Sequence, residues 1–244
     1  MRQISSAARL LAVAALPLAL TACSFITPKA APKPAGAAAD ASKPAAAPAA
    51  DPNKGLLTGK QLKAALAPAS FFPAGFIVEP EGARDTGNGY RLPVTADVPT
   101  PDCTRLDGTS WTGITGIDGV SFAQNDYVNK NSSEEFAQEI DVYRDTTATT
   151  VLDALGKISK ACPSYTDSNT QAKVTVTEKP LAGVGDGAWT ITLTSKAWQG
   201  GTTLMAARVG TSVVSVLVSS GTDNGMTGAT KLTKQLVASL TGKA

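Results

Sequence analysis

The stretch Thr203–Val218, TLMAARVGTSVVSVLV, decides the fold. Two runs rich in valine and other aliphatic residues flank Gly210-Thr211, and this arrangement predicts a β-hairpin with strands at 203–209 and 212–218. Val213-Val214 and Val216-Leu217-Val218 place apolar side chains on both faces of the second strand. Because a strand that is apolar on both faces is typical of the middle of a sheet, we expect it to be central.

Elements on either side of this hairpin follow two hydrophobic periods. Val174 and Val176 alternate with polar residues, and Trp189, Ile191 and Leu193 alternate with threonines, which predicts two half-buried strands. The segment 226–240 instead has a helical stripe, formed by Ala229, Leu232, Leu236, Val237 and Leu240.

The first half repeats this order of helix and strands. We predict a helix from Thr58 through Ala67 that Pro68 stops, then four strands and a helix, at 76–78, 90–94, 120–128, 136–142 and 146–161. Ser132 with Glu135 forms a capping-box pattern, so a helix is the alternative for the fourth strand. The whole order predicts an α+β fold, with an antiparallel sheet and packed helices, as a single globular domain over 56–244.

Residues 1–22 have the pattern of a bacterial export signal. Arg2 and Arg9 flank a polar start, and the apolar run at 10–20 is too short to span a bilayer as a stable helix. The run ends in Leu20-Thr21-Ala22-Cys23, which resembles a lipobox. We therefore predict a lipoprotein signal peptide, and a Cys23 that carries diacylglycerol and further acyl chains such as palmitate. An ordinary secretory signal followed by a chance cysteine is the alternative.

A tether rich in alanine, proline and lysine follows over 23–55. It has almost no aliphatic side chain larger than alanine in its middle, so it cannot offset the entropy of ordering, and we predict a disordered linker. Removal of Arg2 and Arg9 with the signal lowers the 22 basic residues to 20, which equals the 20 acidic residues. A neutral chain gives no electrostatic reason to expect nucleic acid as a partner.

Cys103 and Cys162 are the cysteines that lipidation of Cys23 leaves. Thiols of an exported protein usually pair, because the compartment is oxidising. Val151, Leu155 and Ile158 lie on one helical stripe with Cys162, which directs this cysteine inward. We expect a structural disulfide between the two; a redox-active pair is the alternative, although the chain has no CxxC motif.

Composition argues against several kinds of catalysis. The chain has no histidine, which excludes Ser-His-Asp and Cys-His catalysis and every zinc site that contains histidine. The carboxylates do not reveal a pair that faces a groove, and we interpret them as solvated surface groups: Glu79, Glu81, Asp118, Glu134, Glu135, Asp141 and Asp186. No catalytic residue, metal site or cofactor is predicted.

Binding is better supported, by aromatic residues. Trp111 and Trp198 occur in polar, glycine-rich contexts, so we expect them to be exposed and favour them as ligand contacts. Tyr127 and Tyr143 are further candidates, with Arg208 as an anion partner or as part of a buried ion pair. Trp189 lies on an alternating strand, where core packing is favoured.

Several features together resemble the PknH-like extracellular sensor domain, which occurs on mycobacterial Ser/Thr kinases and on stand-alone actinobacterial lipoproteins. They are the tether, the cysteine in Ala161-Cys162, the glycine-rich Leu181–Asp186 before a strand, and Arg208-Val209-Gly210 before an apolar strand. The resemblance covers most of 57–241 and implies an α+β fold with a ligand cleft outside the membrane. The chain departs from the kinase domains in having one cysteine pair where they have two.

These observations predict a lipid-anchored protein on the extracytoplasmic side of the cell membrane. We expect its domain to be a non-catalytic ligand-binding or sensor module, with a small molecule, a cell-wall ligand or an envelope protein as partner. A structural or assembly accessory that docks onto an envelope protein is one alternative. An enzyme that acts on envelope carbohydrate is the other.

Overall fold

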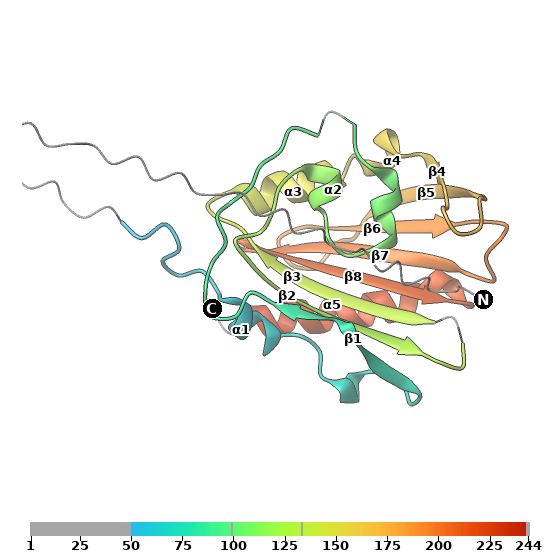
Figure 1. Ribbon diagram of the computed structural model, residues 1–244, viewed down its shortest axis with the longest axis horizontal. Helices are drawn as coiled ribbons and strands as arrows, with labels where there is room; N and C mark the ends of the chain where they lie inside the picture. The colour runs from blue at the N-terminus through green and yellow to red at the C-terminus, as the bar shows by residue number, and fades with distance from the viewer. Residues whose placement is uncertain (1–49, 99, 133, 243–244) are drawn as a thin grey trace, which may run out of the picture. The chain divides into compact units, whose positions relative to one another are not determined.

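One antiparallel sheet of eight strands organises the domain (Figure 1). The computed structural model describes residues 50–242 except 99 and 133; the predicted signal peptide, Cys23 and the tether up to residue 49 lie outside these residues. The strands lie in the order β1-β2-β3-β8-β7-β6-β5-β4. In chain order they are β1 Phe76–Asp85, β2 Ser121–Asn129, β3 Glu135–Val142, β4 Ser164–Thr166, β5 Lys173–Pro180, β6 Ala188–Thr194, β7 Gly201–Val209 and β8 Ser212–Ser220.

Helices cover the two faces of the sheet and divide the core into two clusters. The helices are α1 Gly59–Lys63, α2 Thr112–Thr115, α3 Thr147–Leu155, α4 Ile158–Ala161 and α5 Met226–Thr241. One cluster packs the apolar side chains of α1 and α5 against the sheet, and the other packs those of α2, α3 and α4 (Figure 1). This arrangement confirms the expected α+β fold and the expected antiparallel sheet.

The predicted hairpin forms the middle of the sheet. β8 lies fourth and β7 fifth in the strand order, and both are buried over most of their length. α5 contacts both strands through the predicted stripe, with Ala229, Leu232, Leu236 and Leu240 buried. The central position of 212–218 is therefore confirmed, as is the helix that follows it.

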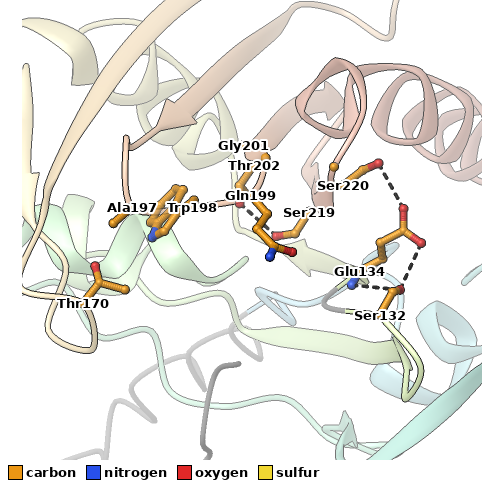
Figure 2. A pocket seen from close by; sticks show the side chains of 12 residues that line it. Ser132, Glu134, Thr170, Ala197, Trp198, Gln199, Gly201, Thr202, Ser219 and Ser220 are labelled. Carbon is orange, nitrogen blue, oxygen red and sulfur yellow. Dashed lines mark hydrogen bonds between the residues drawn. The ribbon is translucent and has the colours of Figure 1, made fainter.

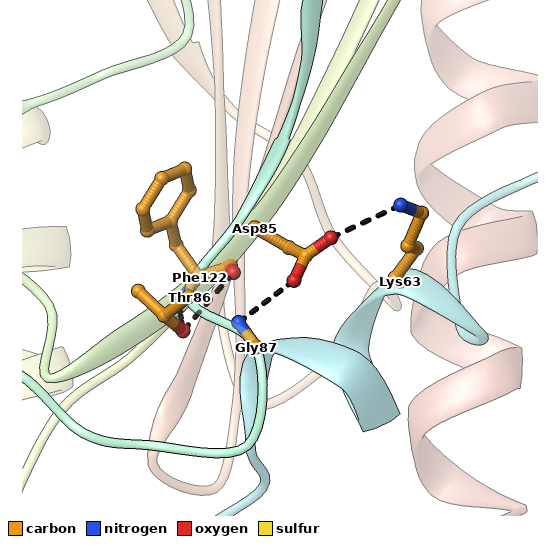
Figure 3. Close-up of polar contacts among 5 residues, drawn as sticks. All are labelled: Lys63, Asp85, Thr86, Gly87 and Phe122. Carbon is orange, nitrogen blue, oxygen red and sulfur yellow. Dashed lines mark hydrogen bonds and ion pairs between the residues drawn. The ribbon is translucent and has the colours of Figure 1, made fainter.

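The corner between α1 and β1 is tied by polar contacts (Figure 3). The Lys63 ammonium lies 3.1 Å from Asp85 Oδ2, and the N–H of Gly87 donates to Asp85 Oδ1 at 2.7 Å. The bond from Gly87, aided by Lys63, lowers the pKa of Asp85. Thr58 caps α1 as predicted, although the helix ends at Lys63 and not at Ala67.

The structure corrects two of the expected strands. β1 continues past Pro80 to Asp85, because an irregularity between Glu79 and Arg84 takes the proline out of the pairing. Residues 90–94 do not form the expected strand; an isolated bridge joins Thr95 to Ile117 instead. Pro93 lacks the N–H that a continuous ladder would require in this segment.

The second half departs from expectation in two smaller ways. The predicted helix over 146–161 breaks into α3 and α4 at Gly156, where an added Cβ would come within 2.4 Å of the Trp189 ring. The short edge strand β4 was not predicted, because three residues are too few to display a period. The strand preferred for 136–142 is confirmed by β3.

The disulfide between Cys103 and Cys162 is present, with 5.6 Å between the two Cα atoms. It joins the 3₁₀ turn at Cys103–Asp107 to the end of α4. The segment 86–119, which carries this turn, is rich in polar residues and glycine and has few apolar side chains to bury. Covalent closure therefore fixes a segment that packing alone holds weakly.

The structure also bears on how the chain meets a membrane. Among residues 50–242, apart from the two gaps, none of the helices has the length and hydropathy that crossing a bilayer requires.

Replacement of Cys103 and Cys162 by serine should lower the free energy of unfolding by about 4 kcal/mol or less. The disulfide closes a separation of 59 residues, and a loop of about 60 residues loses an entropy worth about 4 kcal/mol in the unfolded chain. Urea denaturation of the oxidised protein and the double variant measures the difference. An unchanged midpoint would contradict a stabilising role for the disulfide.

Candidate functional site

A hollow of about 500 Å³ opens where β3 and β7 begin and β8 ends (Figure 2). Its walls come from the β2–β3 hairpin, the β4–β5 loop, the β6–β7 turn and the end of β8. The lining residues are Ser132, Glu134, Thr170, Ala197, Trp198, Gln199, Gly200, Gly201, Thr202, Ser219, Ser220 and Gly221. The volume lies within the range of about 300–1,000 Å³ that is usual for small-molecule sites.

Trp198 forms one wall, and the neighbouring loop holds its ring. The indole N–H donates to Asp167 Oδ2 at 3.1 Å, and Asp167 is buried. Asp167 Oδ1 accepts the backbone N–H groups of Asn169 at 2.7 Å and Thr170 at 2.9 Å. Because one carboxylate both shapes the β4–β5 loop and accepts from the indole, the ring of Trp198 is fixed before any ligand arrives.

Glu134 forms the facing wall and is also held by its neighbours. Its Oε1 accepts from the Ser220 hydroxyl at 3.2 Å, and its Oε2 accepts from the Ser132 hydroxyl at 3.1 Å (Figure 2). Thr202 and Ser219 pair through their hydroxyls at 2.8 Å deeper in the wall. Gln199 is an exposed residue of the β6–β7 turn, and its side chain lies between Trp198 and Glu134 in Figure 2.

Glycines allow the β6–β7 turn to approach the end of β8. A Cβ on Gly200 would come within 2.2 Å of the Ser220 carbonyl oxygen, and one on Gly201 within 2.5 Å of Asn224 Oδ1. The Ser220 carbonyl belongs to the backbone and cannot move away from such a contact, whereas the contact of Gly201 is to the side chain of Asn224. Gly200 therefore allows the close approach of the turn to β8.

Of the predicted ligand contacts, the structure places Trp198 in this hollow and Trp111 elsewhere. Trp111 is only 1% exposed, and its indole N–H donates to the Ser215 hydroxyl at 2.6 Å. The expectation of an exposed Trp111 is therefore wrong. Its polar, glycine-rich segment folds back onto the sheet, and Trp111 is one of the apolar side chains, with Leu106 and Ile114, that the segment buries there.

The two tyrosines do not belong to the hollow either. Tyr127 is buried against Phe72, with ring centroids 3.7 Å apart, and Tyr143 is buried in the other core cluster. Their role as ligand contacts is corrected to core packing. Burial raises the pKa of both phenols.

Arg208 lies at the opposite end of β7 from the hollow. Its Nη1 lies 3.3 Å from Asp186 Oδ2 and donates to the Gly210 carbonyl at 3.2 Å. Six residues separate Arg208 from Thr202 on one strand, which corresponds to roughly 20 Å. The structure therefore supports an ion-pair role for Arg208, but the pair is partly exposed and not buried as that alternative supposed; it joins the segment before β6 to the end of β7.

Most residues of the hollow were not predicted from the sequence. The sequence indicates Glu134 only as a surface carboxylate, and it does not single out Ser220, Gln199 or Asp167. The signal available was the run Trp198-Gln199-Gly200-Gly201, in which a large aromatic precedes two glycines after a strand. Its meaning depends on the pairing of β3 with β8, which are about 80 residues apart in the chain and which no local pattern joins.

β3 carries a second group of polar residues, which the segment 86–119 covers. Glu139 and Asp141 are both buried on one face of this strand, and the Thr109 hydroxyl donates to Glu139 Oε2 at 2.6 Å. The charges of Asp118 and Arg91, two residues of the segment 86–119, also influence the pKa of Asp141. Gly119 lies directly against Asp141, since a Cβ there would come within 3.0 Å of Oδ1.

Burial dominates the electrostatics of this pair. Loss of hydration raises the pKa of Asp141 well above its usual range, and the charges of Glu139 and Asp118 raise it further. Burial also raises the pKa of Glu139, against the bond from Thr109. Neither carboxyl is among the residues that line the hollow. Within the described part of the chain, no group of three or more metal-ligating side chains has a metal-binding arrangement.

Asp141→Asn should raise the free energy of unfolding at pH 7. A carboxyl with a raised pKa in the folded state binds its proton more tightly there than in the unfolded chain. Stability is therefore lost as the pH rises above the ordinary aspartate value of 3.8 and through the raised pKa. Each tenfold change in the acid constant corresponds to about 1.4 kcal/mol.

Denaturation of wild type and Asp141→Asn between pH 4 and pH 8 measures this effect. We expect the variant's advantage to shrink as the pH falls toward 4. Asp153→Asn, on the exposed side of α3, is the matched control and should change little. A constant difference at all pH values would contradict the assignment of a raised pKa to Asp141.

Comparison with known proteins places the fold. No protein-family model matches the chain, and no curated protein matches its sequence. A solved structure, the extracellular domain of PknH from Mycobacterium tuberculosis, is similar with a TM-score of 0.50 and 11% identity, over 76% of this chain and 97% of that one. At this identity the likeness concerns the fold alone, and it confirms the α+β architecture that the resemblance in sequence implied: the chain has the fold of that extracellular domain.

Proposed function

We propose that the domain is an extracytoplasmic binding module, which holds its ligand in the hollow beside Trp198 without converting it. One observation carries the proposal: a hollow of about 500 Å³ whose aromatic wall is held in place by a buried carboxylate. A ring that is already oriented loses little conformational freedom on binding, which favours affinity. The likeness in fold to an extracellular domain agrees with a place outside the cytoplasm.

Membrane attachment is the second part of the proposal. The lipobox-like Leu20–Cys23 would give Cys23 its acyl chains, and the tether would then separate the domain from the bilayer. The far end of the tether is held by the domain, because the Arg144 guanidinium donates to Asn53 Oδ1 at 2.8 and 3.0 Å. A signal would then depend on a partner that recognises the loaded domain.

A ligand for the hollow should raise the melting temperature of the full-length chain. At 100 times its Kd a ligand adds about 2.7 kcal/mol, which corresponds to roughly 5–10 °C for a chain of this size. The compounds to screen are neutral oligosaccharides, cell-wall peptides, glycerophosphate headgroups and inorganic anions. Trp198→Ala should abolish the shift. Trp189→Phe should preserve it, because Trp189 lies near the start of β6, at the other end of this strand from the hollow.

Two results would contradict this part of the proposal. A shift that persists in Trp198→Ala would place the ligand elsewhere on the domain. If none of these compounds shifts the wild-type protein, the hollow is not a binding site for the classes tested, and the docking function below takes its place.

Cys23→Ser should release the protein from the membrane fraction after a salt wash. The thioether to diacylglycerol needs the thiol, and two acyl chains anchor stably where ionic contacts do not. Trp198→Ala is the matched control and should stay with the membranes. Mass spectrometry of the wild type should show a diacylated Cys23 as first residue, and an unmodified residue there would refute the anchor.

A docking function is the second candidate, and exposed apolar side chains favour it. Leu92 is 84% exposed and Val94 52% exposed, and both follow β1 along the same edge of the sheet. The segment pairs with the residues before β2 through backbone hydrogen bonds: the N–H of Arg91 donates to the Val120 carbonyl, and the N–H of Asp118 donates to the Val94 carbonyl. Ile77 and Val78 are further exposed side chains of this edge.

A further inference from the structure

We infer that the ligand of the hollow is an uncharged carbohydrate, bound with one face of a sugar ring on Trp198. This inference rests on the proposed function and names the chemical class of the ligand. Three properties of the wall support it: its aromatic group, its hydroxyls and its charge.

The aromatic group suits a flat ligand with aliphatic C–H groups. Trp198 is the one aromatic residue among the described residues that line the hollow. Its N–H is already bonded to Asp167, so the ring presents a face and not a donor to the ligand. A sugar ring has an apolar face of C–H groups that packs on such a surface, and hydroxyls around its rim that need polar partners.

Polar groups for those hydroxyls line the rest of the hollow. Five side-chain hydroxyls line the hollow, and they belong to Ser132, Thr170, Thr202, Ser219 and Ser220. The exposed Gln199 amide lies between Trp198 and Glu134 (Figure 2). A hydroxyl both donates and accepts, and the amide does so through two atoms, which matches ligands whose own hydroxyls do the same. A purely apolar ligand would remove these groups from water without replacing their hydrogen bonds.

The charge of the wall excludes an anion. Glu134 is the one ionisable side chain among the described lining residues, and no lysine or arginine joins it there. Its two oxygens accept from Ser132 and Ser220, so the negative charge is fixed in place. A carboxylate or phosphate on the ligand would meet this charge with no cation to offset it.

A cation fits less well than a neutral ring. Sites for quaternary ammonium groups enclose the cation in several aromatic faces, whereas this hollow has one. The carboxylate of Glu134 already accepts two hydrogen bonds, and the remaining walls are hydroxyls, an amide and glycine backbone at 200, 201 and 221. The balance of one apolar face and many neutral polar groups is that of a carbohydrate site.

The test begins with an array of neutral, anionic and amine-bearing oligosaccharides and the full-length chain, purified without glycoside detergents. We expect a neutral oligosaccharide to bind with an affinity that salt does not change, since no ion pair forms. Calorimetry with that oligosaccharide should then show that Trp198→Ala weakens binding about 10-fold or more. Trp198→Phe should weaken binding less, because it keeps an aromatic face, and Trp189→Phe should have no effect.

Charge selection supplies the second readout. The uronic acid counterpart of the same oligosaccharide should bind about 10-fold more weakly or worse, and Glu134→Gln should narrow this difference. Glutamine keeps the size of the side chain; its carbonyl oxygen can accept from one serine and its NH2 group can donate to the other, so the charge is removed while both serines keep a hydrogen-bond partner.

Three other outcomes would contradict this inference, and the last of them would also contradict the proposed function. Tighter binding of amine-bearing oligosaccharides, weakened by salt, would identify a cationic ligand and refute this inference. If no oligosaccharide binds but another compound raises the melting temperature in a manner that depends on Trp198, the carbohydrate inference is wrong and the proposed function stands. If nothing binds beside Trp198, both are wrong.

Discussion

Burial of both faces of β7 and β8 is the constraint on which the rest of the structure depends. A helix can cover one face of a sheet, and α5 does so with four buried side chains in one stripe. The other face needs a separate cover, and the chain assembles it from α3, α4 and the segment 86–119. The hydrophobic effect is the main force that positions the first cover, because α5 is long and amphipathic, and the Ser239 hydroxyl adds a hydrogen bond to the Ala65 carbonyl. The second cover includes a segment with few apolar groups, so it needs directional contacts as well.

Two of those contacts are hydrogen bonds and the third is covalent, and each joins the segment 86–119 to a particular strand or helix. Trp111 donates to Ser215 on β8, Thr109 donates to Glu139 on β3, and the disulfide of Cys103 reaches the end of α4. A buried hydroxyl or carboxylate is costly without a partner, so each of these pairs specifies one position of the segment rather than many. The same arrangement leaves Asp141 beside Glu139 with its hydration lost, and the cost of ionising it is a consequence of covering the sheet with a polar segment.

The sequence predicted the elements whose patterns are local and missed those that depend on distant pairing. A period of two identified β5 and β6 and a period of 3.6 identified α5, because each presents an apolar face, whereas continuous apolar runs on both sides of a turn identified β7 and β8. The stripe that ends at Cys162 indicated the disulfide for the same reason. Trp111 was misjudged because the polarity of its neighbours describes their contact with water and says nothing of a side chain that turns inward. The hollow could not be predicted, since its walls meet only when β3 pairs with β8 and when the glycines at 200 and 201 bring the turn against Ser220.

The hollow lies at the ends of the central strands because their middle is filled. β8 is buried as far as Val218, and the half-buried Ser219 and Ser220 that follow carry hydroxyls instead of valines; Ser219 pairs there with Thr202 of β7. Glu134 and Ser220 extend from paired strands, so their positions follow from the rigid core, whereas Trp198 belongs to a turn and needs Asp167 to hold it. A ligand between them would bridge the sheet and the two loops that Asp167 joins.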